Sequence, residues 1–173
     1  GPRDLVELSC TIAGWMLHLA GRADSPQHGY AQASQALADG SALAKFREFV
    51  LAQGGDVAQV DHPDRLPKAP LVTSVPSPNN GYVAGIDARQ VGTAAVLLGA
   101  GRSQKGEAID HSVGIVLRAK VGDPLSIGAP LFEVHAKTEE SLSQTADRLL
   151  AAYEWADAPP GHPRLIKRVL SSR

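Results

Sequence analysis

The chain has 173 residues, with 17 Lys and Arg against 18 Asp and Glu, and a formal net charge of −1. So balanced a charge gives no general field for attracting nucleic acid or an anionic membrane surface. No apolar run approaches the roughly 20 residues of a membrane-spanning helix. The single cysteine, Cys10, cannot form an intrachain disulfide, so we expect a reducing, cytoplasmic compartment.

The first segment is predicted to be a helix with an unusually wide apolar face. Apolar residues recur at helical spacing from Leu5 to Leu19, and Gly21 is expected to end the helix. Asp4 with Glu7 three residues later predicts a capping box at its start. A face this wide needs apolar partners on more than one side, so we expect the helix to lie deep in a larger assembly.

Two more helices are predicted before the chain changes character. Ser25 followed by Pro26 predicts the start of the second, and Ser41 is expected to cap the third. Residues 61–81 then hold five prolines and an Asn-Asn-Gly turn, with one edge strand expected in "APLVTSV". We place a domain boundary near Leu66, which gives domains at 1–66 and 67–173.

The second domain is predicted to mix strands and helices at irregular spacing, which favours an α+β fold over a regular βαβ repeat. The helix "DARQVGTAAVLLGA" is rich in small residues, and we expect Gly92, Ala94 and Ala95 to pack closely against a sheet. Strands are predicted at "GYVAGIDA", "SVGIVLRAK", "APLFEVHAK" and "PRLIKRVL", and a further helix, capped by Thr138, at "TEESLSQTADRLLAAY".

The stretch "LLGAGRSQKGEAIDHSVG" looks most like a functional site. Its glycines fit neither the order of a phosphate-binding P-loop nor the spacing of a dinucleotide-binding motif. A helix precedes Gly99 and Gly101, so the negative end of that helix faces the loop and disfavours a bound anion. Arg102 and Lys105 suit that end as cations. The loop is therefore interpreted as a helix C-cap and tight turn, and the alternative is a loop that touches a substrate or a closing lobe.

Other residues give little evidence of chemistry. Asp110 and His111 are adjacent, and adjacent residues of an extended chain point to opposite faces. The remaining histidines lack the spacing of a zinc site. We assign no catalytic, substrate-binding or metal-binding residue.

The segment "VLRAKVGDPLSIGAPLFEVHAK" has the pattern of the barrel-sandwich hairpin of biotinyl and lipoyl carrier modules, with Gly122 and Gly128 at its turns. Those modules modify a lysine at a hairpin tip. Lys137 occupies the corresponding region here but lacks the usual neighbours. A shared shape is therefore expected more than a shared function, and a stand-alone binding or carrier module is kept as the alternative.

Taken together, several stretches resemble one family. These are "GSALAKFREFVLAQGGD", "LPKAP" and the long run from "GYVAGIDARQVG" through "GAGR" to "VGDPLSIGAPLFEVHAK". In this order they resemble the C-terminal portion of the pyrimidine-nucleoside phosphorylases, which include thymidine phosphorylase. Each motif is modest alone, and the joint match runs from Gly1 to Val169.

The resemblance implies an enzyme that uses phosphate to split pyrimidine nucleosides, working as a homodimer with a small helical and a large α/β domain. Residues 1–66 would then end the large domain, and residues 67–173 would form the C-terminal α+β lobe. The family's catalytic, phosphate-binding and base-binding residues, and a potassium site found in some members, belong to portions that precede a segment like this one. The resemblance therefore implies a segment inactive by itself, whose Gly99–Gly106 loop leans toward the cleft, or a lobe that complements a separate N-terminal chain.

Overall fold

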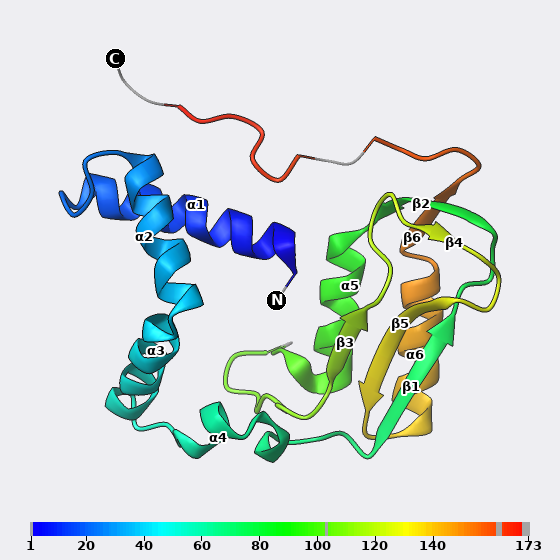
Figure 1. The fold of residues 1–173 in the computed structure, drawn as a ribbon. Helices are drawn as coiled ribbons and strands as arrows, with labels where there is room; N and C mark the ends of the chain where they lie inside the picture. The colour runs from blue at the N-terminus through cyan, green and yellow to red at the C-terminus, as the bar shows by residue number, and fades with distance from the viewer. Residues whose placement is uncertain (1, 103, 162–163, 171–173) are drawn as a thin grey trace. The chain divides into compact units, whose positions relative to one another are not determined.

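We describe a computed structural model of the chain, which covers residues 2–102, 104–161 and 164–170 (Figure 1). The chain forms two compact units. The helical unit comprises the chain up to Arg65 together with the tail from Arg164, and the mixed unit spans Leu66–Pro163. The fold is a mixture of helix and sheet, as predicted. The assignment of 1–66 and 67–173 to two domains of a larger enzyme stays a prediction.

The helical unit consists of α1 (Arg3–Leu19), α2 (Pro26–Ala38), α3 (Ser41–Ala52), α4 (Ala58–Asp61) and a 3₁₀ turn, η1 (Pro63–Arg65). Ser25 caps α2 as predicted, because its hydroxyl accepts a hydrogen bond from the His28 amide. The predicted capping box at Asp4 is wrong. The helix already begins at Arg3, and the Asp4 carboxylate accepts a bond from the adjacent Leu5 amide instead. The cap of α3 is Gly40, one residue before the predicted Ser41.

Two glycines bring α1 and α2 into close contact. A Cβ atom built on Gly14 would lie 2.5 Å from the Pro26 carbonyl oxygen, and one built on Gly29 would lie 2.5 Å from the Gly14 carbonyl oxygen. Both distances are far below van der Waals contact, and both obstacles are backbone atoms. The helices therefore approach each other at a point where neither carries a side chain.

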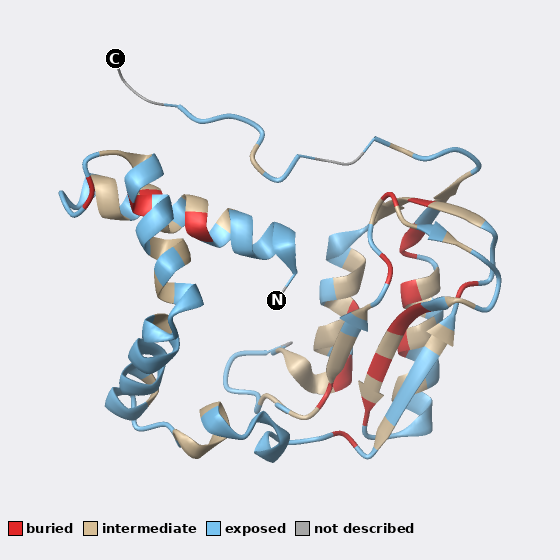
Figure 2. Cartoon of the chain, viewed as in Figure 1, coloured by how far each residue is buried: buried red, intermediate tan, exposed pale blue. Residues whose placement is uncertain are grey.

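The helical unit buries little of its apolar surface within the described chain. Its buried hydrophobic residues are Cys10 and Ala23, and most of α3 is exposed (Figure 2). Met16 is 65% exposed and Phe49 is 58% exposed. Other large exposed apolar side chains of these helices are Leu5, Val6, Ile12, Leu19, Tyr30, Leu37, Leu43, Phe46 and Leu51. The wide apolar face predicted for the first helix is present and only partly covered, since Leu8, Trp15 and Leu17 are half-buried.

The mixed unit contains two three-stranded antiparallel sheets. The first has the order β1 (Leu71–Pro76), β5 (Pro130–Ala136), β3 (Gly114–Leu117), and the second has the order β4 (Pro124–Leu125), β2 (Gly81–Ile86), β6 (Tyr153–Ala156). The strand predicted in "APLVTSV" is β1, and it lies at an edge of the first sheet as expected.

Two helices cover one face of the β1–β5–β3 sheet (Figure 1). They are α5 (Ala88–Ala95), which continues into a π-helical turn η2 (Val96–Ala100), and α6 (Glu139–Leu150). Asp87 caps α5 and the predicted Thr138 caps α6. The core between helices and sheets includes Val83, Ala94, Leu98, Leu131, Phe132, Val134, Leu149 and Tyr153.

Three further predictions for the mixed unit are wrong. The helix predicted for 138–153 ends at Leu150, because Tyr153 begins β6 and pairs with Ile86. The strand predicted in "PRLIKRVL" is absent from the described residues 164–170, and Pro163 lies outside the described chain. Gly92 does not pack against the sheet: it is exposed and a Cβ there would meet no atom, whereas Ala94 is fully buried.

Candidate functional site

The loop from Gly99 to Gly106 leaves the end of the α5–η2 helix in a conformation that requires glycine. Gly99 has φ +103°, a left-handed conformation that side-chain-bearing residues rarely adopt. Its carbonyl oxygen accepts a 2.9 Å hydrogen bond from the Asp110 amide, so the chain returns to the helix end after the loop. The predicted glycine C-cap is thus part of the structure, and the loop starts from a fixed point.

Gly101 and Arg102 shape the first half of the loop. A Cβ on Gly101 would lie 2.7 Å from the Val96 side chain, so the chain passes close to the helix there. The Arg102 Nε donates a 2.9 Å hydrogen bond to the Glu107 carbonyl oxygen and thereby bridges the loop. Lys105 lies on the exposed part of the loop. Residue 103 lies outside the described chain.

Sequence reasoning missed a charged cluster where the loop returns. The Asp110 Oδ1 accepts hydrogen bonds from the Ser112 amide at 2.9 Å and the Ser112 hydroxyl at 2.7 Å. The Asp110 Oδ2 is shielded from solvent and lies 2.6 Å from the Lys137 Nζ. At that distance the two groups form a close ion pair. Lys137 follows Asp110 by 27 positions, and no spacing rule connects them.

The electrostatics of Asp110 follow from these neighbours. The Lys137 ammonium, together with the two bonds from Ser112, holds the pKa of Asp110 well below its usual range. The carboxylate therefore stays ionised at any pH near neutral. A second ion pair, between Arg118 and Glu133 at 2.7 Å, joins β3 to β5 and lowers the pKa of Glu133 in the same way.

The predicted site residues thus share one loop, and in the part of the chain that the structure describes Asp110 and His111 do not form an acid–base pair beside them. Asp110 is held by Ser112 and Lys137, while the adjacent His111 is exposed. Among the described residues, no three His, Cys, Asp or Glu side chains gather as metal ligands. Lys137 follows the end of β5, where its ammonium is engaged by Asp110, which disfavours the role of a carrier lysine at a hairpin tip.

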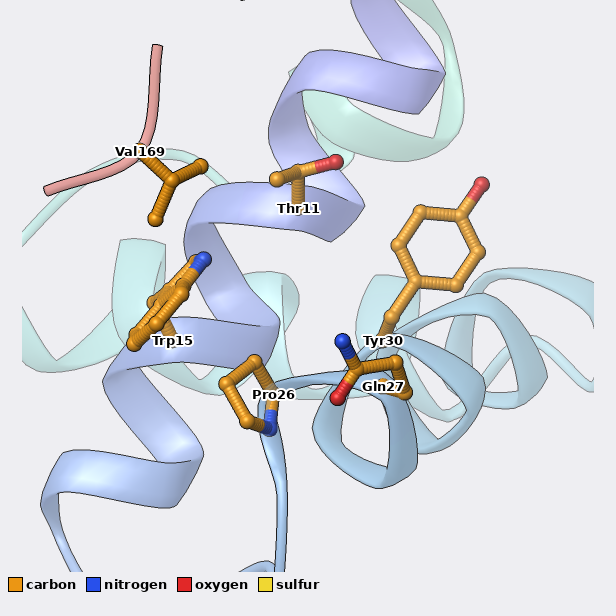
Figure 3. A pocket seen from close by; sticks show the side chains of 6 residues that line it. All are labelled: Thr11, Trp15, Pro26, Gln27, Tyr30 and Val169. Carbon is orange, nitrogen blue, oxygen red and sulfur yellow. The ribbon is translucent and has the colours of Figure 1, made fainter. Parts of the chain in front are cut away.

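The helical unit contains a hollow of about 430 Å³ between α1, α2 and the tail (Figure 3). Trp15 and Pro26 contribute apolar surface, and Val169 lines it from the tail. The remaining lining residues are Thr11, Gln27 and Tyr30. The described residues that line the hollow include no acidic side chain, histidine, cysteine, lysine or arginine. No helix in the described part of the chain is both long and apolar enough to cross a membrane.

Comparison with known proteins connects this fold to one family. Residues 82–156 match the model of the pyrimidine nucleoside phosphorylase C-terminal domain. The chain is 42% identical to the pyrimidine-nucleoside phosphorylase of Bacillus subtilis over 92% of its length, and 42% identical to that of Geobacillus stearothermophilus over 96%. The corresponding protein of Staphylococcus aureus is 39% identical over 99% of the chain.

The matched region covers 37% of the Bacillus protein, 38% of the Geobacillus protein and 39% of the Staphylococcus protein. The chain thus spans about two-fifths of the length of the curated relatives it matches. The matched domain begins in β2 and ends at the last residue of β6, so it contains the Gly99–Gly106 loop and its charged cluster. Over nearly its whole length the chain is similar to the C-terminal part of pyrimidine-nucleoside phosphorylases, and its residues 82–156 match the C-terminal domain of that family.

Proposed function

We propose that the chain is the C-terminal part of an enzyme that splits pyrimidine nucleosides with phosphate. A phosphate oxygen forms a bond to the anomeric carbon of the sugar as the bond from that carbon to the base nitrogen breaks. The products are (deoxy)ribose 1-phosphate and the free base, which takes up a proton. The observation that carries this proposal is the 39–42% identity to pyrimidine-nucleoside phosphorylases over nearly the whole chain.

The proposal includes the finer features expected of the family: a cytoplasmic homodimer, phosphate as co-substrate, and any potassium site formed by other parts of the enzyme. The two sheets of the mixed unit are proposed to form a barrel-sandwich. Backbone bonds between Val83 and the Gly122–Asp123 turn support this, because they link the turn after β3 to the second sheet. No residue of this chain is assigned to the chemical step.

The chain's own contribution is proposed to lie in the Gly99–Gly106 loop. Closing a cleft over the substrates excludes water and fixes the reacting groups, and loops at the cleft commonly take part in such closure. The hydrogen bond from Arg102 to the Glu107 carbonyl supports a defined loop shape. Gly99, Gly101, Arg102 and Lys105 are therefore proposed to form a loop that steadies the closed state.

Replacing Arg102 by Ala in the phosphorylase that contains this chain tests the proposal. Because the arginine bridges only the loop, we expect turnover of thymidine or uridine to fall by about tenfold, with little change in the unfolding midpoint. Arg89→Ala is the matched control, since it removes an exposed positive charge from α5, outside the loop, and leaves the Arg102–Glu107 bond. Unchanged turnover in Arg102→Ala would contradict the role of the loop, and absence of phosphorolysis in the unaltered enzyme would contradict the proposed reaction.

A further inference from the structure

The Gly99–Gly106 loop is anchored at both ends, and the two anchors differ in kind. At its start, Gly99 takes a left-handed conformation in the last turn of a helix that packs into the core through Ala94 and Leu98. At its return, Asp110 bonds to Gly99 through its amide and to Ser112 and Lys137 through its carboxylate. The first anchor is a backbone conformation. The second depends on a side-chain ion pair.

Lys137 provides a firm base for that ion pair. It directly follows β5, the central strand of its sheet, whose Val134 and Ala136 are fully buried. On its other side Thr138 caps α6. The backbone of Lys137 is therefore fixed by the best-packed part of the molecule, although 63% of its side chain is exposed. The ion pair therefore holds Asp110, where the chain returns from the loop, close to this fixed point.

The two partners are unequally exposed to solvent, so removing Lys137 should have a different effect from removing the charge of Asp110. The Asp110 Oδ2 is shielded from solvent, so without Lys137 its charge would be poorly compensated. The Lys137 ammonium can turn to water if Asp110 is neutralised. Removing the lysine should therefore push the Asp110 segment outward, whereas Asp110→Asn leaves the bonds from Ser112 available and removes only the charge.

We propose that Asp110 and Lys137 are positioning residues that hold the Gly99–Gly106 loop in the conformation used for turnover. Neither residue touches substrate in this role; both act through the loop. The proposal rests on the proposed function for its link to phosphorolysis, while its structural part, that the ion pair restrains the loop, stands by itself.

Limited trypsin digestion of the enzyme that contains this chain tests the structural part. Arg102 and Lys105 are exposed trypsin sites inside the loop. Lys137→Met, Asp110→Asn and the double variant should each speed cleavage at these two sites by about three- to tenfold. The double variant should be no faster than Lys137→Met, because all three variants remove the same pair. Lys137→Arg should restore protection.

Glu133→Gln is the matched control, since it breaks an ion pair of the same kind between β3 and β5 that involves no residue of the loop. It should leave cleavage at Arg102 and Lys105 unchanged. The proposal would be overturned if all variants were cleaved at the rate of the unaltered enzyme. It would also be overturned if the increases in rate of the two single variants added up in the double variant.

Steady-state kinetics of the same variants test the link to turnover. We expect kcat to fall by about three- to tenfold in Lys137→Met, with a smaller change in KM and recovery in Lys137→Arg. Faster cleavage with unchanged kcat would overturn the positioning role. An unaltered enzyme without phosphorolysis would refute the proposed function alone, and the cleavage pattern would still decide whether the ion pair restrains the loop.

Discussion

Asp110 illustrates how much a single residue depends on partners distant in sequence. Its amide closes the loop on Gly99, one carboxylate oxygen receives two bonds from Ser112, and the other faces Lys137. The pKa of Asp110 is lowered by these contacts, with Lys137 contributing most. The ionised carboxylate therefore stabilises the folded state.

This lowered pKa predicts the pH dependence of stability. The unfolded carboxyl titrates near about 3.9, so the stabilisation is complete above that pH and is lost as pH falls toward the lower folded pKa. Asp110→Asn should therefore reduce the urea midpoint of the chain at about pH 7, and the gap to the unaltered protein should narrow at about pH 2.5. Asp157→Asn, at an exposed carboxylate, is the control. A gap of equal size at both pH values would show that another group is responsible.

At the scale of elements, α5 shows which small residues matter for packing. Ala94 has no exposed surface and lies in the core, while Gly92 is exposed and a Cβ there would meet nothing. Both residues look alike in the sequence, because each is small and each lies in the same helix. The two residues are two positions apart and so lie on nearly opposite sides of the helix, with only Ala94 directed inward.

Two substitutions in α5 should therefore have opposite effects. Ala94→Leu forces extra volume into a filled core and should lower stability by about 1–3 kcal/mol. Gly92→Ala removes an entropic cost of helix formation without a clash and should raise stability by about 0.5–1 kcal/mol. Thermal unfolding of both variants against the unaltered chain checks this. Destabilisation by Gly92→Ala would mean that a neighbour covers that face.

Much of the fold was predictable from local signals. The Ser25 and Thr138 caps, the edge strand β1 and the glycine turn at Gly99 follow from residue types and spacing. Other predictions failed because they depend on tertiary contacts: the last predicted helix runs on to Tyr153, the first residue of β6, because the pairing of β6 with β2 is not visible in the local pattern. The Asp110–Lys137 pair was missed for the same reason, since sheet topology alone brings its partners together.

At the scale of the whole molecule, the two units differ in how well they bury apolar surface. The mixed unit has a continuous core centred on β5, whereas the helical unit leaves residues such as Met16 and Phe49 largely exposed. The curated relatives of the chain are about two and a half times longer than the region they share with it. The exposed apolar side chains of the helices are therefore consistent with a surface that other parts of a longer protein would cover.

Hydrogen exchange on the 173-residue chain alone should show this difference. Amides of α3, which has no buried residue, should exchange quickly, and amides of β5 should exchange slowly. In the longer protein that we propose contains the chain, α3 should gain protection by about tenfold or more, while β5 changes little. Equal protection of α3 in both settings would contradict a covering partner.

The contact between Gly14 and Gly29 has a consequence for sequence variation. A side chain at either position would strike main-chain atoms of the facing helix, and those atoms are the same whatever residues the helix carries. A substitution at one site therefore cannot be repaired by a smaller side chain at the other. The two positions are independently restricted to glycine, and a library that randomises both should return functional clones that keep glycine at each.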